Sequence, residues 1–127
     1  MEINPIGIIH SPFTEKSKIP SQSTRAPQVK AYIELFPKYE IGTMGLETGQ
    51  KLLIVFGFHR NKRADLQTIP KHGSKLKGIF ATRSSHRPNF LGVSVVKLEK
   101  VEENRLYFSG CDMLDGSPVW DIKPQIK

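Results

Sequence analysis

The chain has 127 residues and a mass of 14.4 kDa, the size of one domain with a sizeable core. Its net charge of +7 and pI of about 9.7 favour a polyanionic partner, although solubility alone also explains them. The single cysteine excludes an internal disulfide, and no apolar run reaches the roughly 20 residues that cross a bilayer. We therefore expect a soluble, cytoplasmic protein with no membrane partner, in which Cys111 is a small buried side chain.

Short apolar runs rich in β-branched and aromatic residues predict strands along most of the chain. In chain order the predicted strands are residues 6–9, 31–36, 52–58, 79–81, 93–98, 106–109 and 119–122. The run 52–58 is the most apolar and predicts a central strand, whereas residues 93–109 predict an antiparallel hairpin. A short helix is predicted only at residues 43–49. This pattern predicts an all-β fold: a small single-sheet antiparallel β-barrel with long functional loops, in one domain spanning residues 1–127.

Two segments without a strand pattern predict the long loops. Residues 11–28 contain three prolines and several Ser and Thr residues, and loops of this length are often functional. Residues 59–77 carry six Lys and Arg residues against one Asp. We predict that this loop binds nucleic-acid phosphates, with a solvated surface as the alternative. The proposed phosphate-binding residues are Lys62, Arg63, Lys71 and Lys75.

Polar side chains concentrate in two further places. Arg83, His86, Arg87 and Asn89 lie within seven positions between two predicted strands, where binding groups are often found; a solvated basic turn is the alternative. Asp112 and Asp115 precede a Gly-containing turn, and a plain hairpin turn explains Asp115 but not Asp112. The four histidines have no metal-ligand spacing, so no metal site is predicted. A nucleophile elbow is also absent, which disfavours a serine hydrolase.

Four blocks of the chain, residues 6–16, 45–47, 78–92 and 112–124, resemble the TsaA-like, or TrmO-type, family of S-adenosylmethionine-dependent tRNA methyltransferases. The two most specific blocks begin at Phe80-Ala81-Thr82-Arg83 and at Asp112. The chain departs from the family pattern at Phe90-Leu91, where Pro-Ile is usual, and at residues 49–51, where Phe-Ser-His is usual. The resemblance implies a β-barrel unlike the Rossmann methyltransferases, a homodimer, and methylation of N6 on the threonylcarbamoyl-modified adenosine beside the tRNA anticodon.

The resemblance also implies site residues. The S-adenosylmethionine site would comprise Ser11, Pro12, Phe13, Gln22, His59, Arg60, Arg83, Leu114, Asp115, Gly116 and Ser117. The substrate-facing residues would be Lys16, His86, Arg87 and Pro88. Because the N6 amine is a poor nucleophile, we expect a catalytic acceptor to orient it, with Asn89 and Asp112 as candidates. Two other interpretations stay open: a methyltransferase acting on a small molecule, and a non-catalytic RNA-binding barrel.

Overall fold

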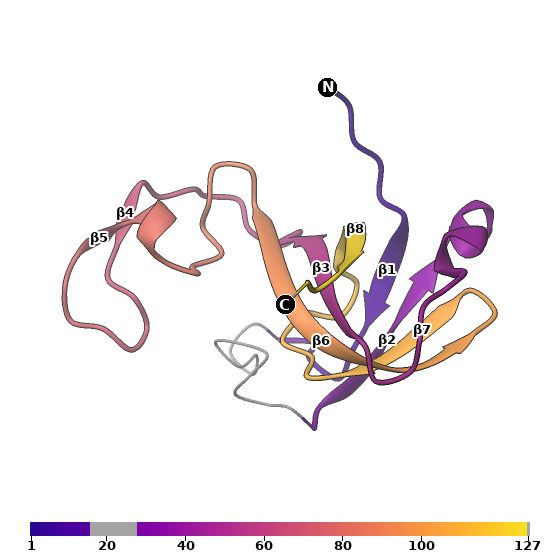
Figure 1. The fold of residues 1–127 in the computed structure, drawn as a ribbon. Helices are drawn as coiled ribbons and strands as arrows, with labels where there is room; N and C mark the ends of the chain where they lie inside the picture. Colours follow the sequence, from indigo (N-terminus) through magenta and orange to yellow (C-terminus); the bar gives the residue numbers. More distant parts are fainter. Residues whose placement is uncertain (16–27, 127) are drawn as a thin grey trace.

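Six strands of the computed structural model, which describes residues 1–15 and 28–126, form a closed antiparallel barrel (Figure 1). Around the barrel the strands follow the order β1, β2, β7, β6, β3, β8. Their bounds are Gly7–His10 for β1, Lys30–Leu35 for β2, Lys51–Gly57 for β3, Leu91–Glu102 for β6, Arg105–Ser109 for β7 and Pro118–Pro124 for β8. The prediction of an all-β, single-sheet barrel is confirmed; β3 pairs with β6 and β8, as every strand of a closed barrel pairs with two neighbours.

The barrel interior is filled by alternate residues of each strand, because successive side chains of a strand point to opposite faces. In β2, for example, Ala31, Ile33 and Leu35 are buried, whereas the residues between them are partly exposed. The buried core also includes Ile9, Leu52, Ile54, Val96, Leu98, Leu106, Phe108, Cys111, Met113 and Val119. Burial of each large apolar side chain contributes about 1.5–3 kcal/mol, which makes the barrel a firm support for the loops at its ends.

Two strand pairings define the closure of the barrel. The predicted hairpin is present as β6 and β7, which pair from Lys97–Ser109 to Glu102–Arg105 around a turn at Glu103. The first and last strands then pair with each other, with Gly7 opposite Val119. The sheet therefore has no free edge between β1 and β8.

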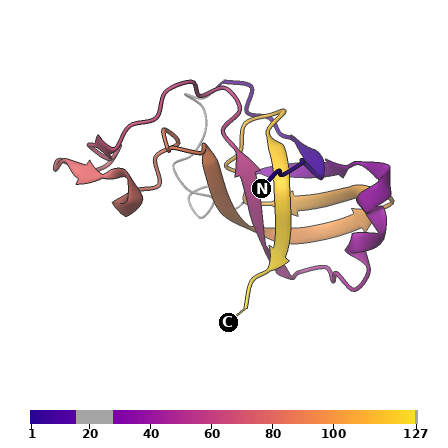
Figure 2. The same cartoon turned by 90° about the horizontal axis from the view of Figure 1, so that it is seen from above.

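A long excursion leaves the barrel after β3 and returns at β6. We call residues 58–90 the arm, and Figures 1 and 2 both show it projecting from one side of the barrel. The arm holds two short paired strands, β4 (Gln67–Thr68) and β5 (Lys77–Gly78), followed by the 3-10 helix η4 (Ile79–Ala81). At its root the Phe58 N–H donates to the Phe90 carbonyl at 2.8 Å.

Two predicted elements are wrong. Residues 79–81 form the helix η4 rather than a strand: Ile79 is buried but Phe80 is 79% exposed, and three residues cannot establish an alternating pattern. The predicted helix at 43–49 is absent, because Gly45 and Gly49 adopt positive φ angles of 92° and 91° that end any helix. A 3-10 helix, η3, instead covers Pro37–Thr43, with proline at its start.

Candidate functional site

Three segments far apart in the sequence meet at the end of β1. We call residues 11–14, 59–60 and 112–117 the mouth cluster. The Ser11 amide donates to Asp115 Oδ1 at 3.0 Å, and the Ser11 hydroxyl donates to the Met113 carbonyl at 2.7 Å. In return, the Asp115 amide donates to the Phe13 carbonyl at 2.8 Å. These reciprocal bonds hold the segment after β1 against the segment before β8.

The third segment of the mouth cluster comes from the root of the arm. Gly116 has a φ of 85°, which favours glycine, and a Cβ at this position would lie 3.5 Å from Nε2 of His59. The neighbouring Arg60 donates from Nη1 to the Thr14 carbonyl at 3.0 Å. The imidazole and the guanidinium are thereby placed beside the other two segments, and both side chains are exposed.

Asp112 is held by a group that lies inside the barrel. The Ser94 hydroxyl, on the inner face of β6, donates to Oδ1 of Asp112. Ser94 is 1% exposed and Asp112 is half-buried, so this carboxylate lies at the boundary between the core and the mouth cluster. The adjacent Cys111 is fully buried, as predicted, and burial raises the pKa of its thiol to about 12.

The polar side chains of the loop at residues 83–89 form hydrogen bonds mainly with backbone carbonyls of the arm. Arg87 donates from Nη1 to the carbonyls of Thr82 at 2.7 Å and Ser84 at 3.3 Å, and Nδ1 of His86 lies 3.1 Å from the Arg63 carbonyl. Arg83 is exposed and donates to the Val93 carbonyl at the start of β6. In the described part of the chain, none of Arg60, Arg83 and Arg87 forms an ion pair with a carboxylate.

Asn89 belongs to the arm rather than to the mouth cluster. It is exposed and lines a cavity of about 230 Å³ together with Phe80, Arg87, Pro88 and Leu91. The lining is largely apolar, apart from the amide and the guanidinium. The two candidate acceptors therefore belong to different segments, Asp112 to the mouth cluster and Asn89 to the arm.

The remaining predicted residues have varied surroundings. Leu114 and Ser117 are buried, and the Ser117 hydroxyl donates to the Leu114 carbonyl at 2.6 Å, so their side chains close the turn before β8. Pro12 is exposed and Phe13 packs partly against the core. Lys16 and Gln22 lie outside the described residues. The four basic residues predicted to bind phosphates are all exposed on the arm: Lys62, Arg63, Lys71 and Lys75.

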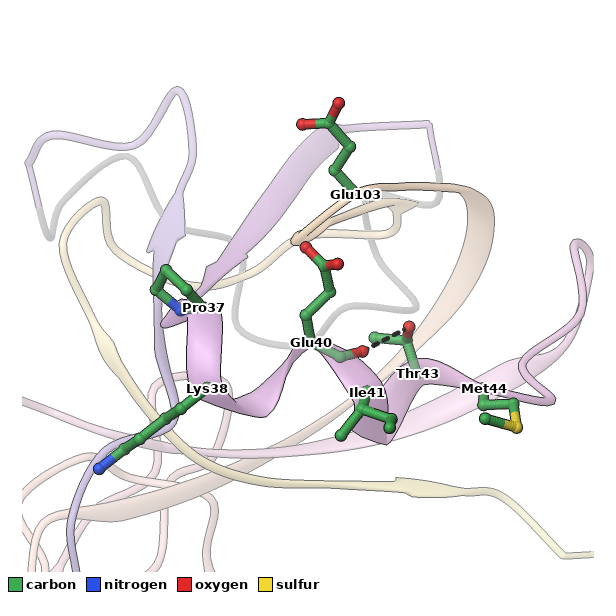
Figure 3. Close-up of a pocket in the computed structure, with 7 residues that line it drawn as sticks. All are labelled: Pro37, Lys38, Glu40, Ile41, Thr43, Met44 and Glu103. Carbon is green, nitrogen blue, oxygen red and sulfur yellow. Dashed lines mark hydrogen bonds between the residues drawn. The ribbon is translucent and has the colours of Figure 1, made fainter.

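A larger cavity, of about 450 Å³, lies beside η3 and contains none of the predicted residues. Figure 3 shows Glu40 pointing toward Glu103, which lies in the turn between β6 and β7. The Thr43 hydroxyl donates a hydrogen bond to the Glu40 carbonyl at 2.8 Å. The helix η3 follows Leu35, which pairs with Gly7 at the start of β1, whereas Ser11 follows the end of β1. This cavity is therefore at the opposite end of β1 from the mouth cluster.

The described residues contain neither a cluster that could hold a metal ion nor a helix that could span a membrane. Among them no group of three or more His, Cys, Asp or Glu side chains is arranged to hold a metal ion. Within the same ranges, none of the helices is long and apolar enough to span a membrane.

Known proteins share this barrel and its surrounding loops. The chain belongs to the family described as the tRNA-methyltransferase O N-terminal domain, whose model matches residues 8–127. It is 46% identical over 130 residues to a putative S-adenosylmethionine-dependent methyltransferase, RcsF, of Pseudomonas aeruginosa, covering 98% of this chain and 54% of that protein. It is 42% identical to a tRNA (adenine(37)-N6)-methyltransferase of Rattus norvegicus, covering 96% of this chain and 30% of the relative.

A solved structure has the same fold. The crystal structure of TrmO from Pseudomonas aeruginosa superposes with a TM-score of 0.84 at 41% identity, covering 99% of this chain and 56% of that one. The chain therefore spans about half the length of the bacterial relatives that it matches.

Sequence reasoning missed three contributors to the candidate site: the carbonyls of Met113 and Thr14, and the side chain of Ser94. The Met113 and Thr14 carbonyls act through the backbone and leave no trace in residue type. Ser94 does leave a signal: it is a hydroxyl residue in phase with Gly92, Val96 and Leu98, the positions of β6 that are buried. A polar residue at such a position needs a buried partner.

Proposed function

We propose that the protein is an S-adenosylmethionine-dependent methyltransferase that acts on N6 of an adenosine in tRNA, specifically the threonylcarbamoyl-modified adenosine beside the anticodon. The observation that supports this most strongly is the mouth cluster. Three of the segments that the family resemblance assigns to the cofactor are more than 40 residues apart in sequence, yet they are linked by hydrogen bonds in the fold. The relative from Rattus norvegicus is named a tRNA (adenine(37)-N6)-methyltransferase, which supports the N6 position and the tRNA substrate.

The residues of the mouth cluster fit this cofactor chemically. Phe13 offers partly exposed aromatic surface, and the absence of a side chain at Gly116 leaves room beside His59. Arg60 of the mouth cluster, and Arg83 of the arm, are exposed guanidiniums without carboxylate partners in the described chain, and either can bind the carboxylate of a methionine moiety. The bound cofactor supplies an activated methyl group on a sulfonium, so the protein needs to supply position rather than a reactive group.

The rest of the reaction is assigned to this chain's own side chains. Asp112 accepts a hydrogen bond from the N6 amine and orients its lone pair toward the methyl group. The arm's exposed lysines and arginines bind tRNA phosphates, because each such contact releases counterions from the nucleic acid. Phe80 and Asn89, on one cavity of the arm, are suited to contacting an unstacked base of the anticodon loop.

A second copy of the chain completes this assembly. Besides Phe80, the arm exposes three large apolar side chains, Leu66, Ile69 and Leu76, which are 57–72% exposed. A two-fold dimer is the commonest closed arrangement that covers such a surface. We place this dimer in the cytoplasm, where tRNA is modified and where an unpaired cysteine stays reduced.

Transfer of a labelled methyl group from S-adenosylmethionine to total tRNA tests the function, with the methylated nucleoside identified by mass spectrometry. We expect label in an N6-methylated, threonylcarbamoyl-modified adenosine. Cofactor binding without transfer to any tRNA, followed by transfer to a small-molecule fraction, would favour the small-molecule methyltransferase. RNA binding with no cofactor binding by calorimetry would favour the non-catalytic barrel.

The dimer is tested with the double variant Leu66→Ser, Leu76→Ser. Both side chains are exposed in the single chain, so the barrel should fold normally while the association weakens. Sedimentation at micromolar concentration should show a dimer for the wild type and a monomer for the variant. The matched control is Ile41→Ser, Met44→Ser, which alters two side chains in and next to η3 that are at least as exposed and should leave the dimer intact. A monomeric wild type with full activity contradicts the proposal.

A further inference from the structure

Ser94 is a polar residue in an otherwise apolar environment. It faces inward from β6, opposite Ile54 of β3, and the next inward residues along β6 are Val96 and Leu98. A valine would fill the same position and bury no polar atom. A buried hydroxyl without a partner costs about 1–3 kcal/mol, so a serine here requires a partner.

That partner is the carboxylate of Asp112. The Ser94 hydroxyl donates to Oδ1 of Asp112, and an ionised carboxylate is a hydrogen-bond acceptor only, which fixes the direction of the bond. The donor is anchored on a twelve-residue strand that pairs with β3 on one side and β7 on the other. Asp112 is instead on the segment between β7 and β8, which has no regular structure. The bond therefore ties a loop carboxylate to the rigid wall of the barrel.

The same segment continues into the mouth cluster. Asp112 is followed by Met113, whose carbonyl accepts the bond from Ser11, and by Asp115, which accepts the bond from the Ser11 amide. On its other side lies Cys111, a thiol whose pKa of about 12 reflects burial first and the nearby Asp112 charge as a smaller cause. Cys111 consequently stays neutral over the working pH range, and it donates to the Met113 carbonyl at 3.7 Å.

We infer that Ser94 is a positioning residue for methyl transfer: it holds the Asp112 carboxylate in the orientation that accepts the proton of the attacking amine. This inference rests on the proposed function. In the step, the amine nitrogen forms a bond to the methyl carbon while the carbon–sulfur bond breaks and its electrons return to sulfur. The amine then loses a proton to Asp112, so the sulfonium becomes a neutral thioether and the product amine is neutral.

The test compares Ser94→Val with Ser94→Thr, which have nearly the same shape but differ in the hydroxyl. Both introduce the same additional methyl group at a buried site, so any packing cost is common to the two variants. We expect Ser94→Val to lower kcat about tenfold, which is the effect expected from the loss of one hydrogen bond to a charged group. The KM values for cofactor and tRNA should not change. Ser94→Thr should recover most of the wild-type kcat.

Two further measurements separate this role from a merely structural one. In an Asp112→Asn background, the Ser94→Val change should have no additional effect on kcat, because the group that it positions is already lost. By NMR titration of the Asp112 carboxyl, the pKa should be higher in the Val variant than in the Thr variant, because a donor to the charged form is missing.

Each result bears on a different claim. Wild-type protein that transfers no methyl group overturns the proposed function, while the NMR comparison still tests whether Ser94 controls Asp112. An active enzyme in which the Val and Thr variants share the same kcat and the same Asp112 pKa overturns the positioning role. If Ser94→Val fails to fold, Ser94→Ala is compared with Ser94→Cys, which replaces the hydroxyl with a weaker donor, and the same ordering of kcat is expected.

Discussion

The mouth cluster and the arm hold their polar groups in different ways. In the mouth cluster, backbone and side-chain bonds join segments that precede or follow barrel strands, and Asp112 is bonded to a strand itself. In the arm, Arg87 and His86 bond to carbonyls of the arm, and large apolar side chains stay exposed. This difference indicates that the mouth cluster and the arm have different roles. Under the proposed function, the reacting groups would need the rigid support of the mouth cluster, whereas the arm would supply the surface that contacts RNA.

The largest expected effect concerns which region supplies the catalytic acceptor. Asp112→Asn keeps the shape of the side chain but removes the proton acceptor, so we expect methyl transfer to fall about a hundredfold while cofactor and tRNA binding persist. Asn89→Ala should have a smaller effect on the rate, because Asn89 is exposed on the arm. Single-turnover rates with saturating tRNA make the comparison. Equal losses in the two variants would show that the arm takes part in the chemistry, for example at the mouth cluster of a second copy.

The next largest effect concerns tRNA binding by the arm. Changing Lys62, Arg63, Lys71 and Lys75 to Gln should weaken tRNA binding and lower the slope of log affinity against log salt by about one unit per lost contact. The matched control changes four exposed lysines outside the arm to Gln: Lys30, Lys38, Lys51 and Lys97. Filter binding over a salt series measures both. If the two sets reduce the slope equally, the arm binds RNA no better than the barrel surface.

A smaller effect, on cofactor affinity, tests the guanidinium of Arg83, which donates to the Val93 carbonyl in β6. Arg83→Ala should weaken S-adenosylmethionine binding by about 1.5–3 kcal/mol, as expected for loss of a charge-assisted hydrogen bond. Arg63→Ala is the control, because Arg63 pairs with Asp65 on the arm and should leave cofactor affinity unchanged. Calorimetry with the folded proteins decides between them, and unchanged affinity in Arg83→Ala would remove Arg83 from the cofactor site.

The smallest expected effect is on the free energy of unfolding, and it compares a glycine of the mouth cluster with a glycine of the arm. Gly116→Ala, in the mouth cluster, places a side chain at a φ of 85° and should reduce the free energy of unfolding by about 1–2 kcal/mol. Gly78→Ala, in the arm, meets nothing within 4 Å at an ordinary φ of −63°, and should raise stability by about 0.4–1 kcal/mol. Urea unfolding at one protein concentration measures both changes. A destabilised Gly78→Ala protein would mean that the arm is as constrained as the mouth.

Five strands of the barrel, β1, β2, β3, β6 and β7, show burial that alternates with period two over at least four residues, and all six are rich enough in β-branched and aromatic residues to be predicted. Residues 79–81 were not predictable, since a run of three apolar residues gives the same pattern in a strand and in a turn of helix. The strands β4 and β5 have two residues each, too few for any periodicity. The register that closes β1 on β8 depends on pairing across more than 100 residues, which no local pattern encodes.

The candidate site, like the fold, could be predicted from the sequence only in part. The resemblance selected Ser11, His59 and Asp115, and the fold brings their segments together. The chemistry of the amine offered Asn89 and Asp112 as alternative acceptors, and the fold places them on different segments, Asn89 on the arm and Asp112 beside Ser94. Residue type alone indicates what a side chain can do. Only the tertiary structure shows that Ser94 reaches Asp112 and that Arg87 is occupied by backbone carbonyls.

The pairing of the first strand with the last has a consequence for biosynthesis. Gly7 can pair with Leu35 early, but it pairs with Val119 only when residue 119 has been made, so the barrel stays open while residues 1–118 are being translated. The segments 11–14 and 112–117 flank that same seam, and they meet only as it closes. A nascent chain therefore has no mouth cluster, and gain of cofactor binding during refolding would report closure of the barrel as a whole.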